Sequence, residues 1–333
     1  MRCRFGNQLS NWSRLAHAAS VGTSPSEEAQ DSMPRRRLHS FRMPAVLLSI
    51  FVVLVPGLAR AAELLPLGTY DWSEPDDEFG GFSALVIAAD GGSFYAASDR
   101  GELYRATVNR DGSGKIASVR GIWHDRFQGN RGKPVSGFTA DAEAMATDRE
   151  GRLVVAFESY ARIAAYSPPD MMPVALSSWD RFKAIWGNEG FESLLVLPDD
   201  RLMVIVEAQS NGGYPTYIEE GGEWQAGPPL PVPDDFHAVD ATIGPDGKVY
   251  LLERRHSLIT GYQSRVRRLA LPDDGVWRDA ADELLLTRPG ELDNMEGIGL
   301  WRTSGGRTIV TLISDDNFSP FQRTIIAEYE LNE

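Results

Sequence analysis

A pair of short hydrophobic segments joined by a turn recurs five times along this chain. The positions that we take as equivalent in the five copies are Ser83, Glu143, Glu192, Asp240 and Glu296. They are separated by 60, 49, 48 and 56 residues, a spacing in or just above the range of a four-stranded propeller blade. The repeat therefore predicts a ring of similar modules, which would gather equivalent side chains at one site.

Each copy is predicted to be a β-hairpin. A turn signal such as Asp90-Gly91-Gly92 lies in the middle of every copy, and a run of β-branched or aromatic residues follows it. We therefore expect an all-β fold, a β-propeller with five blades of about four strands. A sixth blade within one of the longer intervals is the alternative. The last copy supplies only about three strands, so residues 63–72 are expected to complete its sheet and close the ring.

The N-terminal residues are expected to lie outside the fold. Residues 34–61 combine a basic stretch, an apolar run and the sequence Ala59-Arg60-Ala61, which is typical of a signal peptide cleaved before Ala62. An uncleaved membrane anchor is the alternative. Residues 1–33 have no hydrophobic periodicity and are expected to be a disordered leader or to precede the true start at Met33. The mature domain at 62–333 is thus predicted to be periplasmic or secreted, without stable membrane insertion.

Removal of residues 1–61 makes the chain more acidic. The mature domain would hold 25 basic and 44 acidic residues and carry a net charge near −19. Such a charge argues against nucleic acid or an anionic membrane as a partner. It is compatible with cation binding and equally with an acidic surface that keeps the protein soluble. The one cysteine, Cys3, would be lost with the leader, which excludes disulfides and thiolate metal sites in the mature domain.

Acidic residues recur at the start of the first strand and at the end of the second strand of the repeat. These two places are adjacent in an antiparallel hairpin, and in a propeller they would surround one mouth of the channel. The acids at strand starts are Glu143, Glu192, Asp240 and Glu296. The acids at strand ends are Asp99, Glu158, Glu207, Glu253 and Asp315. Up to nine carboxylates in these two sets are therefore predicted to face one opening.

Crowded carboxylates require raised pKa values, neighbouring arginines or a bound cation. Oxygen donors without cysteine favour calcium, and after it magnesium, over zinc. The predicted metal ligands are Asp99, Asp141, Glu158, Glu207, Asp240, Glu253, Asp315 and Asp316. The alternative is that these acids accept hydrogen bonds from backbone amides of neighbouring loops.

The same segments resemble the phytase-like family known by its "esterase-like activity of phytase". The resemblance covers roughly residues 64–331. The motifs that carry it are Ser98-Asp99-Arg100-Gly101, Asp141-Ala142-Glu143, Gly190-Phe191-Glu192, Asn294-Met295-Glu296-Gly297 and Ser314-Asp315-Asp316-Asn317-Phe318. The resemblance implies a β-propeller, suggests phosphoester hydrolysis and, by analogy to the six-bladed propeller phytases, suggests calcium as cofactor.

The first functional hypothesis is metal-assisted hydrolysis of a small-molecule phosphoester. The residues expected to carry catalysis are Glu143, Glu192, Glu296, Arg100, Arg254 and His237. The arginines would clamp phosphate oxygens, and the histidine would move a proton. A salt bridge to the adjacent acid is the alternative role for each arginine.

Two other functions are compatible with the same sequence. One is a non-catalytic propeller that binds a ligand or a protein, since a fold does not determine a function. The other is a calcium-dependent lactone or carboxyl-ester hydrolase, because a cation polarises a carbonyl as readily as a phosphoryl oxygen. The motif of a serine hydrolase is absent from the sequence. We expect the mature protein to be a monomer.

Overall fold

The computed structural model describes residues 61–333 except 160, 179, 181, 183–189, 208, 211, 272–276 and 278–280. The expectations for the leader at 1–33 and the signal peptide at 34–61 concern residues outside this part, Ala61 excepted. Within the described part, no helix is both long and apolar enough to cross a membrane.

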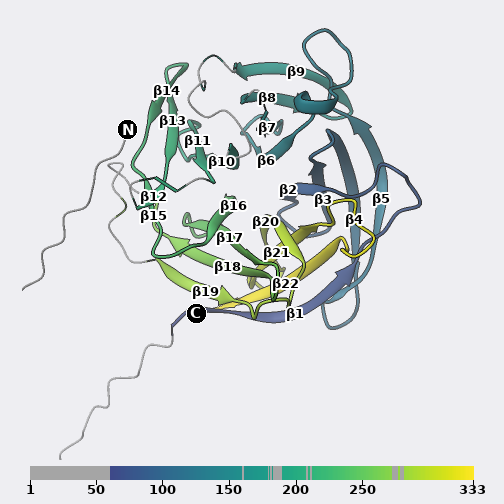
Figure 1. Ribbon diagram of the computed structural model, residues 1–333. Coiled ribbons are helices and arrows are strands. Elements are labelled where there is room, and N and C mark those ends of the chain that lie inside the picture. Colours follow the sequence, from purple (N-terminus) through teal and green to yellow (C-terminus); the bar gives the residue numbers. More distant parts are fainter. Residues whose placement is uncertain are drawn as a thin grey trace, which may run out of the picture. The chain divides into compact units, whose positions relative to one another are not determined.

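The strands form five four-stranded antiparallel sheets arranged as blades around an axis (Figure 1). The first blade contains β2 (Phe82–Ile87), β3 (Ser93–Ser98), β4 (Glu102–Arg110) and β5 (Ile116–Arg126). The second contains β6 (Ala142–Thr147), β7 (Leu153–Phe157), β8 (Arg162–Ser167) and β9 (Asp170–Ser177). The third contains β10 (Phe191–Val196), β11 (Leu202–Val206), β13 (Thr216–Glu220) and β14 (Glu223–Ala226).

The remaining blades complete the ring. The fourth contains β16 (His237–Ile243), β17 (Val249–Ser257), β18 (Gly261–Leu269) and β19 (Asp282–Leu286). The fifth contains β20 (Asn294–Arg302), β21 (Thr308–Asp315), β22 (Ile325–Asn332) and β1 (Glu63–Asp71). The short strands β12 (Gly213–Tyr214) and β15 (Leu230–Pro231) pair with each other, and η1 (Gly137–Thr139) is a single 3-10 turn. The prediction of an all-β propeller with five blades is confirmed.

The N-terminal strand closes the ring, as predicted. β1 pairs antiparallel with β22 from Glu63 opposite Asn332 to Asp71 opposite Ile325. The chain then passes to the first blade, where Trp72 is 2% exposed and its ring stacks on Phe82 at 5.1 Å. The two ends of the chain are thus held in one sheet, in which β1 is the outermost strand and covers the edge of β22.

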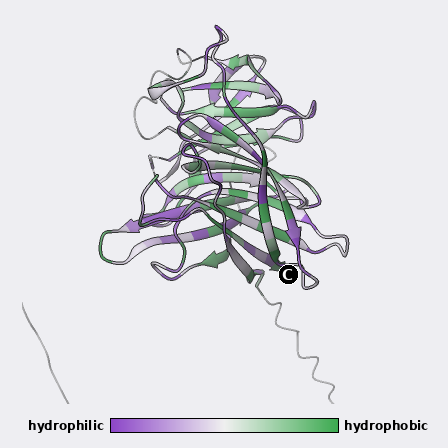
Figure 2. Ribbon diagram, turned by 90° about the vertical axis from the view of Figure 1, so that its right-hand side faces the viewer, coloured by the Kyte–Doolittle hydropathy of each residue, from purple (hydrophilic) through white to green (hydrophobic). Residues whose placement is uncertain are grey.

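The hydrophobic core lies between neighbouring blades. Buried side chains form five clusters, and each cluster joins residues of two adjacent blades. Val155 of the second blade, for example, packs with Leu103 of the first. Figure 2 shows hydrophobic residues along the strands and hydrophilic residues in the connecting loops. Because each blade is buried on both faces by its neighbours, the ring fixes the positions of the strands nearest the axis.

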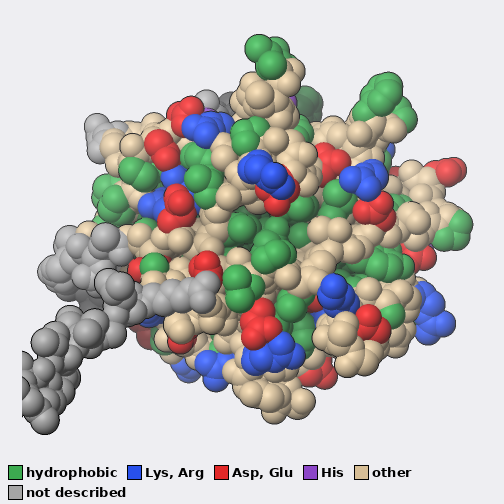
Figure 3. All heavy atoms as spheres, turned by 90° about the horizontal axis from the view of Figure 1, so that it is seen from below, with side chains coloured by type: hydrophobic (Ala, Val, Ile, Leu, Met, Phe, Trp, Pro, Cys, Tyr) green, Lys and Arg blue, Asp and Glu red, His purple; other side chains and the backbone are tan. Residues whose placement is uncertain are grey.

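The outer surface carries charges of both signs. Figure 3 shows red and blue side chains interspersed on the side of the molecule that carries β1 and β19, with hydrophobic side chains between them. Two of the exposed hydrophobic residues, Leu65 and Leu286, belong to these two strands. A mixed surface of this kind is typical of a soluble domain.

Replacement of Trp72 tests this closure. Trp72→Ala should lower the free energy of unfolding by about 3–5 kcal/mol, because the indole packs against Phe79, Phe82 and Phe94 at the junction of the first and fifth blades. Urea unfolding followed by circular dichroism measures the change. The matched control is Phe321→Ala, since Phe321 is 94% exposed and should change stability by about 0.5 kcal/mol at most. Equal effects of the two substitutions would contradict the packing argument.

Candidate functional site

The first strand of every blade contains a β-bulge at the same place. The first strands β2, β6, β10, β16 and β20 contact one another around the axis. In β6, Ala142 lies opposite Phe157 and Ala144 lies opposite Ala156, so Glu143 is an extra residue between two paired positions. The bulged residues of the five blades are Ser83, Glu143, Glu192, Val239 and Glu296. A bulge redirects its side chain, and here it does so at one end of the channel.

A second equivalent position follows the end of each hairpin. The residue paired just before the bulge lies opposite a residue of the second strand, and that residue is followed in the five blades by Asp99, Glu158, Glu207, Arg254 and Asp315. The register therefore places three acids of the bulge position and four acids of this second position at the same end of their hairpins, as the sequence predicted. Asp141 and Asn294 each lie two residues before the bulged residue of their blade.

In the fourth blade, the bulge lies one residue before Asp240, the position that the sequence repeat predicted to be equivalent. Ala238 lies opposite Glu253, and the bulge falls on Val239. Asp240 and Glu253 are therefore not equivalent to the acids of the other blades, and the prediction that they face the opening is wrong. Side chains alternate along a strand, so a shift of one residue reverses the side to which each one points.

Both of these acids lie in buried hydrogen-bond networks. Asp240 accepts bonds from the amides of Ala241 (2.8 Å) and Ile298 (2.8 Å), so it joins the fourth blade to the fifth. Burial raises the pKa of Asp240 well above its usual value, although the two amides lower it. Glu253 accepts bonds from Arg265 (2.7 Å) and from Arg267 (2.7 Å to each carboxylate oxygen). These partners make both acids structural.

Asp316 also has structural partners. Its Oδ1 atom accepts bonds from the amides of Gly81 (3.0 Å) and Phe318 (3.0 Å), and its Oδ2 atom accepts a bond from the hydroxyl of Thr324 (3.2 Å). Asp316 therefore ties the fifth blade to the first. The guanidinium of Arg100 lies 3.2 Å from the centre of the Phe318 ring, at an exposed position beside this junction.

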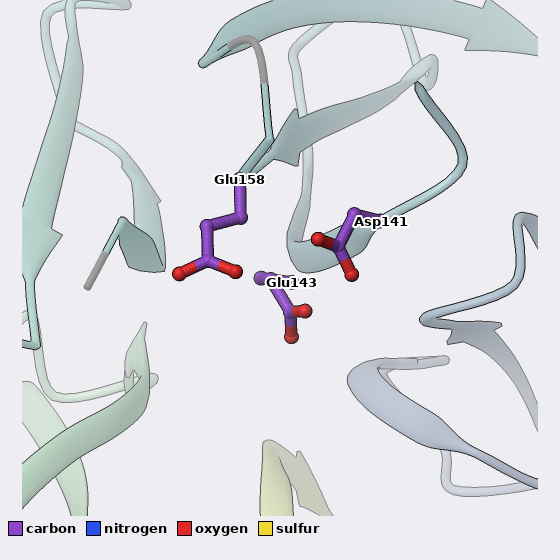
Figure 4. Close-up of side chains that lie close together, drawn as sticks. All are labelled: Asp141, Glu143 and Glu158. Carbon is purple, nitrogen blue, oxygen red and sulfur yellow. The ribbon is translucent and has the colours of Figure 1, made fainter. Parts of the chain in front are cut away.

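Three acids of the second blade converge closely. Asp141, Glu143 and Glu158 each offer a carboxylate oxygen, and these atoms lie within 4.8 Å of one another. Figure 4 shows the three side chains around a common space. Burial raises the pKa of Glu143 well above its usual value, and repulsion from Glu192, Asp141 and Glu158 raises it further. The fold thus holds these carboxylates close together at a cost in electrostatic free energy.

The electrostatic contacts continue around the ring. Burial first, and then repulsion from Glu207 and Glu158, raise the pKa of Glu192 well above its usual value. Burial also raises the pKa of Asp99 to about 7, with further contributions from Asp315 and Asp141. The axial group therefore contains eight acids: Asp99, Asp141, Glu143, Glu158, Glu192, Glu207, Glu296 and Asp315.

One arginine lies within this group of acids. Arg254 occupies the position that holds an acid in the other four blades, and it forms ion pairs with Glu296 and with Glu207, the latter at 3.6 Å. It also donates to the side-chain oxygen of Asn294 (2.6 Å), whose amide donates to Glu296 (2.8 Å). The Nδ1 atom of His237 lies 3.7 Å from Glu207. Arg254 and His237 thus lie within this group of acids. Asn294 belongs to the group as well, although it was not among the predicted site residues.

Asn294 could have been found by its place in the repeat. It occupies the same position as Asp141, two residues before the bulged residue of its blade. An amide there supplies both a donor and an acceptor. The signal in the sequence is this position in the repeat, which an amide can occupy as well as an acid.

The opposite end of the channel is apolar. A cavity of about 220 Å³ lies there, and all five first strands contribute to its wall. Its lining includes Leu85, Met145, Leu194, Ile243 and Leu300. A charged ligand would therefore approach the axis from the acidic end.

The donor set fits a hard cation. Carboxylate oxygens from several blades converge, and one of them, Oδ1 of Asp99, is buried without a hydrogen-bond partner. Oxygen donors and a flexible number of ligands suit calcium better than zinc. The carboxylate oxygens that lie close enough together to hold such an ion belong to Asp141, Glu143 and Glu158.

The raised pKa of Asp99 predicts a pH dependence of stability in metal-free protein. The folded state binds this proton more tightly than the unfolded chain does, so stability falls as the pH rises from about 4 through about 7. At pH 8 in EDTA, Asp99→Asn should therefore raise the free energy of unfolding by roughly 2–4 kcal/mol, and the gain should shrink towards pH 4. Urea unfolding across this range measures it. The exposed Asp77→Asn is the control, and a gain for Asp99→Asn that is independent of pH would contradict the argument.

The comparisons with known proteins identify one family. No curated protein matches the chain. Similar solved structures include an α-L-arabinofuranosidase from Podospora anserina in complex with cellotriose (12% identity, 82% of this chain and 98% of that chain, TM-score 0.49). They also include the PQQ-bound aldose sugar dehydrogenase of Streptomyces coelicolor (13%, 81% and 98%, 0.47) and the calcium-binding protein regucalcin of Agrobacterium tumefaciens (10%, 77% and 92%, 0.42). The model of the family "Phytase-like: Esterase-like activity of phytase" matches residues 77–318. With this match over most of its length, the chain belongs to the phytase-like family.

Proposed function

We propose that this protein is an exported hydrolase of small-molecule phosphoesters that depends on a divalent cation, with calcium as the first candidate. The observation that carries the proposal is the gathering of eight carboxylates and one arginine from the blades at one end of the channel. Membership of the phytase-like family supports the choice of reaction.

A phosphate could not occupy this group of acids without a cation. Two like unit charges about 4 Å apart repel by about 4 kcal/mol at the effective dielectric constant near a protein surface, and a phosphate dianion would meet several carboxylates at once. A bound divalent cation would neutralise the phosphate charge and make a water molecule more acidic. The raised pKa values of Glu143 and Glu192 mark the place where added positive charge is most favourable.

Arg254 is the side chain placed to bind the substrate directly. Its guanidinium already contacts two carboxylates and an amide oxygen, and a guanidinium can exchange such partners for phosphate oxygens in the same geometry. Asn294 and Glu296 hold it towards the axis. His237 is 53% exposed and lies beside Glu207, where its ring nitrogen can exchange a proton with a group at the mouth.

Addition of calcium should stabilise the protein and activate it. Calcium at 100 times its dissociation constant should raise the free energy of unfolding by about 2.7 kcal/mol by mass action, and EDTA should reverse the change. Phosphate release from phytate and from an aryl phosphate should follow the same calcium titration. Phosphatase activity that survives EDTA, or its absence at every calcium and magnesium concentration, would exclude the proposal.

Glu143 provides the matched test of the site. Glu143→Gln should lower kcat about 100-fold or more, in the range expected for loss of a catalytic carboxylate, and should weaken the calcium-dependent rise in Tm. In EDTA the same variant should be at least as stable as the wild type, because it removes a repelled charge. The control is Glu150→Gln, whose carboxylate is 69% exposed; it should leave kcat, calcium affinity and stability unchanged. Equal activities of the two variants would place the reaction elsewhere.

The same assays separate the other functions. Hydrolysis of a lactone or carboxyl ester at the same calcium concentration, without release of phosphate, would assign an esterase. Calcium binding without any hydrolysis would assign a binding propeller. Size-exclusion chromatography and detection of the mature N-terminus near Ala62 test the proposals of a monomer and of export.

A further inference from the structure

A second cavity lies in the second blade, outside the axial group of acids. Its volume is about 410 Å³, and it lies between the loop at 128–139 and the outer strands β8 and β9. None of its lining residues belongs to the eight axial acids. This cavity is therefore separate from the acidic end of the channel.

Hydrogen bonds hold the walls of this cavity in place. The amide of Gln128 donates to the carbonyl of Met171 (3.1 Å), and the amide of Val135 donates to the carbonyl of Phe127 (2.8 Å). The hydroxyl of the buried Tyr166 donates to the carbonyl of Gln128 (3.2 Å). These bonds fix the start of the loop to the outer strands and join Val135 back to Phe127, so the wall of the cavity is ordered before any ligand binds.

The charged side chains that line the cavity are all basic. They are Arg131, Lys133 and Arg162, and no acidic residue is among the lining residues. Arg131 and Lys133 are exposed, and neither forms an ion pair with another residue in the described part of the chain. Arg162 donates to the carbonyls of Thr139 and Ser159 and lies 3.8 Å over the Phe157 ring. Arg131 and Lys133 thus place two unpaired cations in one wall, in a chain whose net charge is −14, and this local excess of positive charge is suited to an anion.

A buried hydroxyl in the same cavity has no partner. Ser177 is 8% exposed, and its Oγ atom forms no hydrogen bond. A buried polar atom without a partner costs free energy, and native structures satisfy most such atoms. Because the Oγ atom has almost no accessible surface, a ligand with an acceptor oxygen would satisfy it once the Ser177 side chain turns into the cavity.

The remainder of the wall is apolar. It includes Pro134, Val135, Ile163, Ala164, Pro173 and Ala175. A free inorganic ion would leave this surface in contact with water. A ligand with an apolar body would bury it, at a gain of roughly 25 cal/mol for each Å².

We propose that this cavity binds a small organic anion that has an apolar body. The carboxylate or phosphate group would lie against Arg131 and Lys133, and the body would lie against the apolar wall, with Ser177 Oγ donating to the ligand. None of the residues on which the proposed hydrolysis depends lines this cavity.

Calorimetric titration of the full chain in EDTA tests the proposal. The probes are phenyl phosphate and benzoate, with the uncharged benzyl alcohol and inorganic phosphate for comparison. Phenyl phosphate or benzoate should bind at least about tenfold more tightly than either comparison probe, and salt should weaken the binding. Binding should persist in Glu143→Gln, which separates this cavity from the axial site. Equal affinities for benzyl alcohol and both anionic probes would overturn the proposal.

Variants then locate the binding. The double substitution Arg131→Gln and Lys133→Gln should reduce the affinity for the anionic probe about tenfold or more. The control removes the same charge from exposed residues of the first blade, Lys115→Gln with Arg120→Gln, and should have no effect. Ser177→Ala should weaken binding severalfold while leaving the Tm equal or slightly higher, since it removes an unpaired hydroxyl. Unchanged affinity in both cavity variants would overturn the proposal.

Discussion

The position of one β-bulge in each blade decides which side chains surround one end of the channel. The inner hairpins are otherwise ordinary antiparallel pairs, whose side chains alternate between the two faces of the sheet. The bulge interrupts that alternation at the end of the channel, and its side chain is Glu143, Glu192 or Glu296 in three of the five blades. Packing between the blades then holds these carboxylates close together despite their repulsion, because the cores on both sides of each blade cannot shift independently.

The fourth blade shows how strictly the register controls the chemistry. Val239 takes the bulge and Arg254 takes the following position, so this blade contributes a cation where the others contribute acids. Glu253, one residue earlier, lies inside the blade with Arg265 and Arg267. Neighbouring residues of one strand thus serve two unrelated purposes. The arginine offsets part of the negative charge of the channel, whereas the buried glutamate contributes only to the structure of its own blade.

Much of the fold could be predicted from the sequence because the repeated hydrophobic runs correspond to the buried strands of each blade. The hairpins near Glu143 and Glu192 share turns, hydrophobic runs and acids, and the N-terminal strand was expected where the last blade lacked one. The site was harder to predict. A bulge adds a residue without altering the hydrophobic pattern, so Val239 and Asp240 could not be distinguished by spacing alone. One partner of Asp316 was hidden for another reason: Gly81 lies directly before the first blade, more than two hundred residues away in the chain.

Charge is also separated within the second blade. Asp141, Glu143 and Glu158 meet at the axis, while Arg162 begins the next strand and faces a cavity without acids. Direct pairing of these groups would have neutralised both places and left little reason for a ligand to bind at either. The blade instead keeps excess negative charge in the channel and excess positive charge beside it. If both proposed sites are occupied, an ion of the opposite sign relieves the excess charge at each site, and binding stabilises the folded protein by mass action.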